Sequence, residues 1–269
     1  MARRPLYALP DDNIAPSAAL TLPNGTADPF NPLANIASRE PAIPFMTSSS
    51  GTAVDVIFEH DAPTDVQAVS VHNHNIPDGT DVRLQRNAAN SWGAPSMDVA
   101  LDLGAAEPDG LPLPYWKDLR GEVGYGSYLY TRLHVPSLAQ IVAIGEVALW
   151  KTLRNDIVNL IAQDSEGEFH LDAGWQTGYG NRVIGTMGTR LRLQLVSFAV
   201  DEYDRAAILT LLRSCGGMFR PFLWVRDSNT TDGWYARISQ DLKQDFVEGH
   251  YAISTTIEEM SIGIELPTS

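Results

Sequence analysis

Apolar and polar residues alternate with a period of two through much of the chain between Val54 and Trp150. Successive residues of a strand point to opposite faces of a sheet, so this period predicts half-buried strands. The segments are short, and Gly, Pro, Asn and Asp separate them, as is typical of an antiparallel sandwich. The expected strands are 54–59, 69–72, 82–85, 97–103, 129–135 and 141–150.

The first 50 residues have a different character, because prolines recur from Pro5 to Pro44. Proline lacks a backbone N–H and does not suit a helix interior or a central strand. The segment is therefore either an extended arm that lies over a neighbouring subunit or a set of loops wrapped around its own domain. In an assembly protein the arm is the expected form.

Beyond Trp150 one helix is expected, at about residues 203–215. Asp201 or Asp204 can accept hydrogen bonds from its first turn, and Gly216 and Gly217 supply the left-handed conformation that ends a helix. Apolar residues recur along it at helical spacing and form one stripe. The stripe comprises Ala207, Ile208, Leu211, Leu212 and Cys215.

Strands are expected on both sides of this helix. Before it, the glycine-rich segment 174–188 is a loop or a long hairpin, and residues 190–198 alternate, with Arg190 and Arg192 on one face and leucines on the other. Three β-segments follow it. Arg190, Arg192 and the large aromatic residues of these segments are candidates for a subunit interface or for the core. The aromatic candidates are Phe222, Trp224 and Trp234.

These patterns predict a mainly β protein. Residues 1–50 are the proline-rich arm or loops, and 51–151 form a jelly-roll-like sandwich. Residues 152–269 form a second sandwich against which the helix packs.

The C-terminal segments resemble a known family. After the helix come Arg-Pro-Phe-Leu-Trp (220–224), Trp-Tyr-Ala-Arg-Ile (234–238) and a last strand that ends in Glu258-Glu259. This order is similar to that in the tube-like β-sandwich of minor and distal tail proteins of long-tailed bacteriophages, over about residues 150–265. The resemblance implies a homomeric ring at the tail tip or baseplate, six-fold by family habit, although a trimer is also compatible. It implies tail tube, hub and fibre proteins as partners, and assembly in the host cytoplasm into the virion.

The first sandwich resembles the discoidin-like, galactose-binding-like jelly roll. The resemblance rests on the strand at Val71–Asn75, the Tyr- and Arg-rich strand at Tyr128–Val135 and the closing strand at Ile144–Trp150. In many distal tail proteins the accessory domain follows the tube-like domain, whereas here it precedes it. The identity as a distal tail protein, as opposed to a neighbouring minor tail protein, stays open.

Charge and cysteine content narrow the classes of function. The formal net charge is −14, which disfavours specific nucleic-acid binding, although DNA could slide through an acidic ring lumen. Cys215 is the single cysteine, which excludes an intramolecular disulfide, and its place on the apolar stripe favours a buried thiol. No apolar run is long enough to span a bilayer, and the N-terminus lacks the apolar region of a signal peptide.

Catalytic patterns are absent from the sequence. His72 and His74 share one face of an expected strand and are weak candidates for a metal site, but a zinc site needs further ligands. The alternative is that they are polar residues at a strand end. No nucleophile elbow or phosphate loop occurs, and Glu258 and Glu259 point to opposite faces of a strand. We expect neither an enzyme nor a cofactor.

Aromatic residues gather in or beside the loops of the first sandwich. Exposed rings on a sandwich rim can stack on sugars or anchor an interface, whereas buried rings only complete the core. The candidates are Trp92, Tyr115, Trp116 and Tyr125. Two functions follow: a structural component of a phage tail tip that presents the first sandwich outward, or a carbohydrate-binding, lectin-like module. A metal-dependent glycan hydrolase is a third, and it would require metal at His72 and His74.

Overall fold

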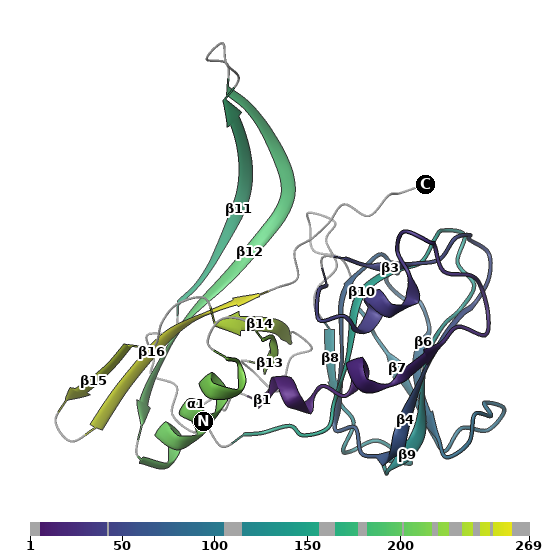
Figure 1. Cartoon of the computed structure of the whole chain (residues 1–269), viewed down its shortest axis with the longest axis horizontal. Coiled ribbons are helices and arrows are strands. Elements are labelled where there is room, and N and C mark those ends of the chain that lie inside the picture. Colours follow the sequence, from purple (N-terminus) through teal and green to yellow (C-terminus); the bar gives the residue numbers. More distant parts are fainter. Residues whose placement is uncertain are drawn as a thin grey trace.

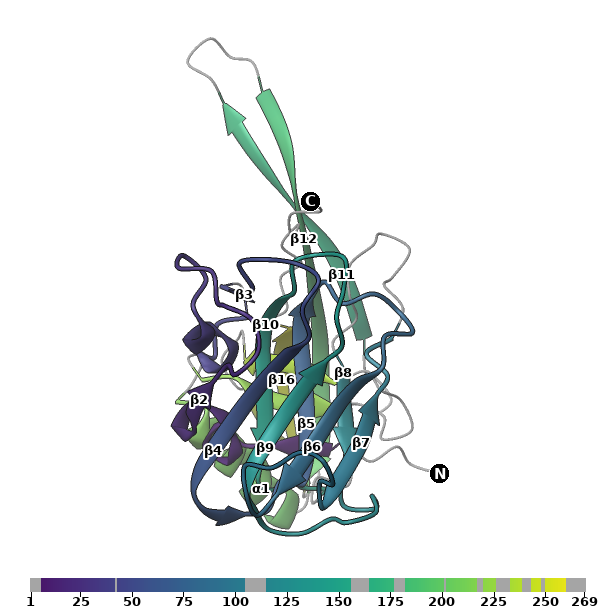
Figure 2. The ribbon, with the colours of Figure 1, turned by 90° about the vertical axis from the view of Figure 1, so that its right-hand side faces the viewer.

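The computed structural model describes residues 6–41, 43–104, 115–155, 165–176, 182–200, 202–216, 220–225, 233–238, 243–247 and 250–259. They form three antiparallel sheets and one α-helix, so the prediction of a mainly β protein is confirmed. Figures 1 and 2 show a sandwich at one side, a third sheet beside it and a long two-stranded ribbon that stands away from the body.

The first sandwich consists of a five-stranded and a four-stranded sheet. The five-stranded sheet has the order β2 (Ala19–Thr21), β4 (Val54–Thr64), β9 (Tyr128–Val135), β6 (Val82–Asn87) and β7 (Met97–Leu101). The four-stranded sheet has the order β3 (Phe45–Met46), β10 (Ala143–Trp150), β5 (Ala68–His74) and β8 (Tyr115–Asp118). Each strand expected from the alternation is present, and β2, β3 and β8 are additional.

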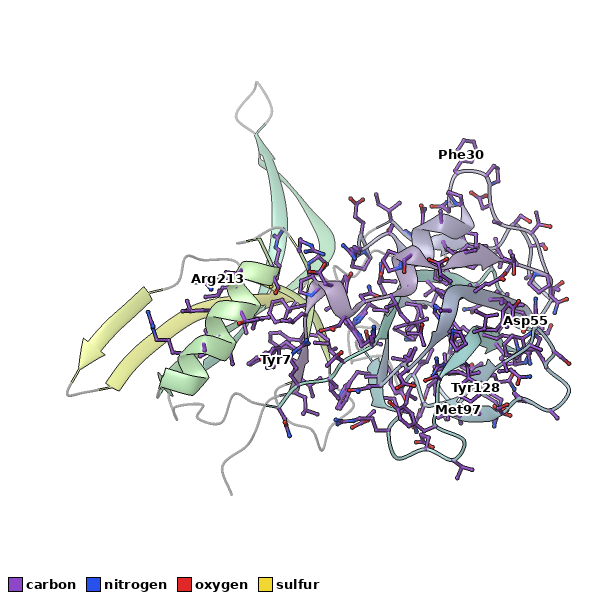
Figure 3. The ribbon with its side chains drawn as sticks, turned by 60° about the horizontal axis from the view of Figure 1, so that its bottom comes forward. Tyr7, Phe30, Asp55, Met97, Tyr128 and Arg213 are labelled. Carbon is purple, nitrogen blue, oxygen red and sulfur yellow. The ribbon has the colours of Figure 1, made fainter. Side chains whose placement is uncertain are left out.

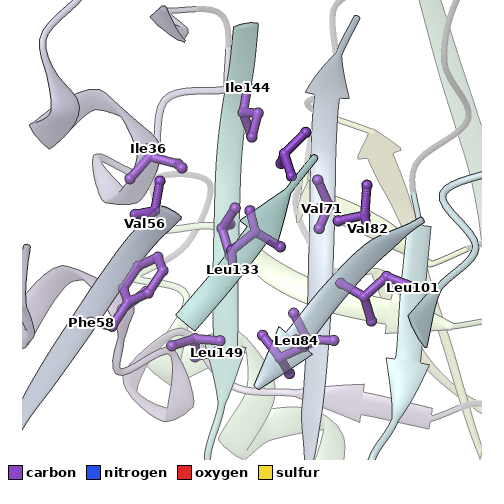
Figure 4. Close-up of a cluster of buried hydrophobic side chains, with 14 of the residues drawn as sticks. Ile36, Val56, Phe58, Val71, Val82, Leu84, Leu101, Leu133, Ile144 and Leu149 are labelled. Atoms are coloured by element: carbon purple, nitrogen blue, oxygen red, sulfur yellow. The ribbon is translucent and has the colours of Figure 1, made fainter. Parts of the chain in front are cut away.

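The core of the sandwich lies between these two sheets (Figure 4). Alternate residues of each strand face it, as the period of two requires. On β4 these are Val54, Val56 and Phe58, and Val69 and Val71 of β5 face them from the opposite sheet. Burial of such side chains is the main favourable contribution to the stability of the sandwich.

The third sheet comes mostly from the second half of the chain. Its order is β1 (Leu6–Ala8), β13 (Phe222–Val225), β14 (Trp234–Ile238), β16 (His250–Glu259), β12 (Arg182–Val200) and β11 (Ser165–Gln176), and β15 (Lys243–Val247) also pairs with β16. The prediction of a hairpin over the glycine-rich segment is met by β11 and β12. Residues 177–181, at its tip, lie outside the described residues.

The helix α1 (Glu202–Ser214) packs on one face of the third sheet. Ile208, Leu211 and Cys215 of the expected stripe are buried there, and Ala207 and Leu212 are partly buried against them. Gly216 has a φ of +60°, so it ends the helix in the left-handed conformation, as predicted. Asp201 and Gly217 lie outside the described residues, and so does the side chain of Asp204.

The opposite face of the third sheet packs on the four-stranded sheet. Leu223, Val225 and Tyr235 meet Ala148 and Trp150 across this contact. The layers are therefore the five-stranded sheet, the four-stranded sheet, the third sheet and the helix. Among the described residues, the second half of the chain contributes one sheet. This sheet packs on the four-stranded sheet of the first sandwich, which takes the place of the second sheet expected for residues 152–269.

Residues 6–41 and 43–50 lie on the chain's own two halves, so the preference for an arm over a neighbour is corrected in favour of wrapped loops. β1 pairs with β13, and its Tyr7 exchanges backbone hydrogen bonds with Arg154 at 3.0 and 2.8 Å. The segment then forms the 3₁₀ turns η1 (Pro10–Asp12), η2 (Ala15–Ser17) and η3 (Leu33–Ala37). Proline suits such turns because its φ is preset and its missing N–H is not needed.

Candidate carbohydrate-binding loop end

Three connections of the first sandwich lie at one end of it, and we call them the loop end: residues 65–67, 88–96 and 119–127. Strand register brings them together. Thr64 pairs with Tyr128 and Asn87 pairs with Tyr130, so the ends of β4 and β6 meet the start of β9. The pairing of Ala68 with Asp118 places the end of β8 beside the start of β5.

Arg86 holds the loop end together from inside the sandwich. Its side chain is fully buried, and its guanidinium donates to Thr131 Oγ1 at 3.2 Å, Gly126 O at 2.9 Å and Thr64 O at 2.5 Å. Burial lowers the pKa of Arg86 to about 10, so it remains charged at neutral pH. Three acceptors from β9, from a loop of the loop end and from the end of β4 thus share one cation.

Tyr128 makes further contacts that hold the loop end together. Arg86 lies 5.3 Å from the centre of its ring, and the Tyr128 hydroxyl donates to Gly124 O at 2.6 Å. Gly124 in turn presses against the neighbouring loop, because a Cβ built on it would lie 2.1 Å from Ser96 O. The loops are therefore fixed relative to one another before any ligand arrives, which reduces the entropic cost of binding.

The loop end presents both rings and polar groups. Tyr125 and Tyr128 are half-buried against the core, which leaves part of each ring accessible. Asp65 accepts a hydrogen bond from Ser127, and Asp118 pairs with Arg120 at 2.6 Å. Burial, followed by the charge of Asp65, raises the pKa of Tyr125, so its hydroxyl stays protonated and can donate. A partly apolar, partly hydrogen-bonding surface of this kind matches the chemistry of a sugar.

Trp92 extends this surface onto the outer face of the five-stranded sheet. Its ring covers the guanidinium of Arg132 at 4.7 Å, and its Nε1 donates to Asn90 at 2.8 Å. Arg132 donates from Nε to Gln85 at 2.8 Å. Beside it, Asp55 receives hydrogen bonds from three sides. The groups around Asp55 are Asn24 Nδ2 at 2.5 Å, His134 Nδ1 at 2.6 Å and Arg132 Nη1 at 3.5 Å. Figure 3 labels Asp55 and Tyr128 on this sandwich.

Two of the four aromatic candidates are at the loop end and two are not. Trp92 and Tyr125 lie there, on separate loops. Tyr115 and Trp116 are each 4% exposed, so neither presents a ring to a surface ligand. Both lie on β8, where Tyr115 faces the sandwich core and Trp116 faces the third sheet.

His72 and His74 are both buried on β5. Burial lowers the pKa of His72 to about 3 and that of His74 to about 4, and His74 Nδ1 accepts the N–H of Ile76 at 3.2 Å. Within the described part of the chain, no three His, Cys, Asp or Glu side chains lie close enough to hold a metal ion together.

The remaining candidates belong to the second half of the chain. Phe222, Trp224 and Trp234 are buried against helix α1, so the structure assigns them to the core. Arg190 and Arg192 lie in β12, and their side chains are outside the described part.

Cys215 is fully buried, as expected, and burial raises the pKa of its thiol to about 12. No described helix is long and apolar enough to cross a membrane.

Arg86 and Asp65 were missed by the sequence reasoning. A signal for Arg86 exists, because it follows Val82 and Leu84 at a spacing of two and therefore occupies an inward position of β6. An arginine at an inward position must find acceptors, which predicts an organising role. Asp65 carries no such signal, since its place beside Ser127 depends on how two distant connections fold.

Comparisons with known proteins give matches of shape only. No protein-family model matches the chain, and no curated protein matches its sequence. Among solved structures, the module CpGH89CBM32-6 produced by Clostridium perfringens has 14% identity and a TM-score of 0.38, and the match covers 52% of this chain and 99% of that one. A fucose binding module of Streptococcus pneumoniae has 10% identity and a TM-score of 0.39, over 52% of this chain and 95% of that one.

A further match is the lectin domain of lectinolysin complexed with Lewis B antigen, with 10% identity and a TM-score of 0.39, over 52% of this chain and 96% of that one. Identities and scores this low assign no role to any residue here, so the loop end is judged on its own geometry. The resemblance to phage tail proteins stays a prediction.

Proposed function

We propose that the protein binds carbohydrate through the loop end of its first sandwich. The observation that carries this proposal is the set of accessible aromatic rings, from Trp92 and Tyr125 on the loops and Tyr128 at the start of β9, in a loop end that Arg86 and the contact of Gly124 with Ser96 hold in place. The C–H face of a sugar packs on such rings, and its hydroxyls bond to neighbouring carboxylates and amides. Asp65 and Asn90 are groups of that kind in the loops themselves.

A glycan-array screen of the full chain, followed by calorimetry with the best glycan, tests the proposal. Replacing Tyr125 or Trp92 by Ala should weaken binding by about fivefold, since the loss of one stacked ring is worth roughly 1 kcal/mol. Phe30→Ala is the matched control, because Phe30 is 88% exposed and lies outside the loop end. If no glycan binds, or if all three variants weaken binding equally, the loop end is not a sugar site.

We propose as a second function that the chain is a structural subunit of a phage tail tip, which assembles into a homomeric ring. The observation that favours it is the ribbon of β11 and β12. β16 pairs with β12 from Leu193 to Val200, so residues 182–192 of β12 pair within the described part only with β11. The ribbon stands away from the body (Figure 1). An isolated two-stranded ribbon is marginally stable in water, so contacts with a neighbouring subunit would stabilise it.

In this second function the ring would continue the tail tube in the virion, with hub and fibre proteins as partners. The test is the mass of the purified chain by light scattering, with negative-stain images of the same fraction. Rings with a central hole are expected. Replacing residues 173–185 with a two-residue Asn-Gly turn should abolish the rings and leave glycan binding unchanged. Monomers of the intact chain at every concentration would contradict the proposal.

A further inference from the structure

Buried polar atoms without hydrogen-bond partners gather at the contact between the first sandwich and the third sheet. We call this group the junction cluster: Asn13, Arg39, His72, Glu146 and Tyr235. Glu146 and His72 are paired across β10 and β5, and the His72 ring lies 5.1 Å from the Tyr235 ring of β14. Buried polar groups are nearly always hydrogen-bonded, so several unpaired groups in one place require an explanation.

Glu146 is the centre of the cluster. Its side chain is fully buried, Oε2 accepts the backbone N–H of Arg39 at 2.9 Å, and Oε1 has no partner. Burial holds the pKa of Glu146 well above its ordinary value, against the opposing influence of Arg39 and Asn13. His72 is neutral at pH 7 because burial lowers its pKa to about 3, and burial together with the charge of Glu146 raises the pKa of Tyr235.

The backbone around Glu146 is held in unusual conformations. In the described part of the chain, Arg39 (φ +66°) and Asn73 (φ +52°) are the two non-glycine residues with positive φ. Asn73 Nδ2 donates to Pro41 O at 2.8 Å, and a Cβ on Gly145 would lie 2.2 Å from that same oxygen. Strained backbone of this kind persists only where surrounding structure enforces it, and here it aims the Arg39 N–H at the carboxyl group.

We propose that Glu146 is a proton-dependent lock between the first sandwich and the third sheet. As a neutral carboxylic acid it fits between the sheets and donates its proton within the junction cluster. As a carboxylate it leaves a charge against Tyr235 and neutral His72 that only the Arg39 backbone N–H, the Asn13 side chain and the half-exposed Arg39 guanidinium can offset. Rising pH therefore weakens the contact of Trp150 and Tyr235 and loosens the first sandwich from the third sheet.

The direction of this pH dependence follows from the linkage between proton binding and folding. A carboxyl whose pKa is raised in the folded state adds stability that is fully present below its unfolded value and is lost as pH rises through the folded value. The groups that face Glu146 are His72 from β5, Tyr235 from β14, Arg39 after η3 and Asn13 after η1. His72 does not change charge in this window, since its pKa of about 3 is far below it.

Hydrogen exchange of the full chain at pH 6 and pH 9, corrected for the intrinsic effect of pH, tests the lock. Peptides that cover β1 and β13 should lose protection by about tenfold or more at pH 9, whereas peptides of β4 and β9 keep it. Glu146→Gln mimics the protonated acid and should abolish this loss. Glu40→Gln, at an exposed position, should behave like the unchanged protein.

Equal protection of β1 and β13 at both pH values, or the same loss in Glu146→Gln, would overturn the lock. If Glu146→Gln does not fold by circular dichroism, infrared spectroscopy of the unchanged protein decides. A carboxylic-acid C=O band that persists at pH 7 and disappears toward pH 9 supports the proposal, and its absence at pH 7 refutes it.

Discussion

At the scale of single residues, the first sandwich depends on polar side chains placed inside it. Arg86 occupies an inward position of β6 where an apolar residue would be expected, and it satisfies acceptors from three segments. His60 is buried as a neutral imidazole, and so are His74 and His72, the latter with its ring against Tyr235 of the third sheet. Such groups contribute little when all are satisfied, but the removal of one partner leaves another unpaired in a medium of low dielectric constant.

Arg86→Met should lower the free energy of unfolding by about 2–4 kcal/mol, because it leaves the carbonyls of Thr64 and Gly126 without donors. Arg83→Met on the same strand is the control. Its partners, Asp81 and Asp98, are exposed, so its loss should cost about 1 kcal/mol or less. Urea unfolding curves of the two variants measure the difference, and equal effects would contradict a framework role for Arg86.

Acid should destabilise the protein through its buried histidines. Burial is the main cause that lowers the pKa of His60 and His74 to about 4 and that of His72 to about 3. Between pH 6.5 and these values the unfolded chain binds protons that the folded chain does not, so stability falls with falling pH. Each histidine contributes up to about 1.4 kcal/mol per pH unit to this slope, and Glu146, whose raised pKa makes the folded chain bind a proton in the same window, opposes it by about one histidine's share. Urea unfolding between pH 6.5 and 5 measures it, and His72→Gln should reduce it by one histidine's share.

At the scale of elements, the loops at the loop end are fixed by contact with one another and with Arg86. Gly124 is decisive because it combines a φ of +79° with a close approach to Ser96. A side chain there is strained by its own backbone and also collides with a neighbouring loop. β10 shows a second effect of context: all eight of its residues are buried, since it has a sheet on either face. Its nearly continuous apolar sequence is the pattern of a strand buried on both faces.

Gly124→Ala should therefore lower the free energy of unfolding by more than about 1 kcal/mol and weaken glycan binding by moving Tyr125. Gly121→Ala, in the same loop, meets no atom within 4 Å and serves as the control. Thermal unfolding and calorimetry of both variants give the comparison. If a folded Gly124→Ala variant binds the glycan as tightly as the unchanged protein, the contact between Gly124 and Ser96 does not contribute to the glycan site.

At the scale of the whole molecule, the two halves of the chain form one stack of layers. β1 comes from the first ten residues, yet it pairs with β13 of the third sheet and bonds to Arg154. Ala68, Trp116 and Trp150 of the first sandwich face Leu223 and Tyr235 of the third sheet in a single buried cluster. The sandwich is thus held to the sheet by apolar burial, and the junction cluster lies within that contact.

Gly233 lies at this contact, and a Cβ on it would come within 2.5 Å of the Trp116 ring. Gly233→Ala should push Trp116 away from β14 and raise hydrogen exchange in peptides of β1 and β8, while β4 and β9 stay protected. Gly93→Ala, which meets nothing within 4 Å, should leave exchange unchanged in all four strands. Uniform exchange changes throughout the chain would indicate general destabilisation instead of a loosened contact.

Local pattern was sufficient for much of the fold. Alternation located β4, β5, β6, β7, β9 and β10, and helical spacing located α1 and its buried stripe, because these signals depend on which face of one element is apolar. β8 was missed, since Tyr-Trp-Lys-Asp (115–118) is short and does not alternate strictly. Of the four aromatic candidates, Trp92 and Tyr125 lie at the loop end. Tyr115 and Trp116 are buried because of the way the sheets pack on one another, which no local pattern encodes.

The amino-acid sequence alone therefore predicted a mainly β chain, most of its strands between residues 54 and 150, the helix α1 and the buried Cys215. Tertiary structure decided which connections meet at the loop end, that the N-terminal segment contributes a strand to each of the three sheets, and that Glu146, His72 and Tyr235 share one buried contact. The physical reason is range: residue periodicity reports how one element meets the core, whereas strand register and sheet packing depend on contacts between residues far apart in the chain.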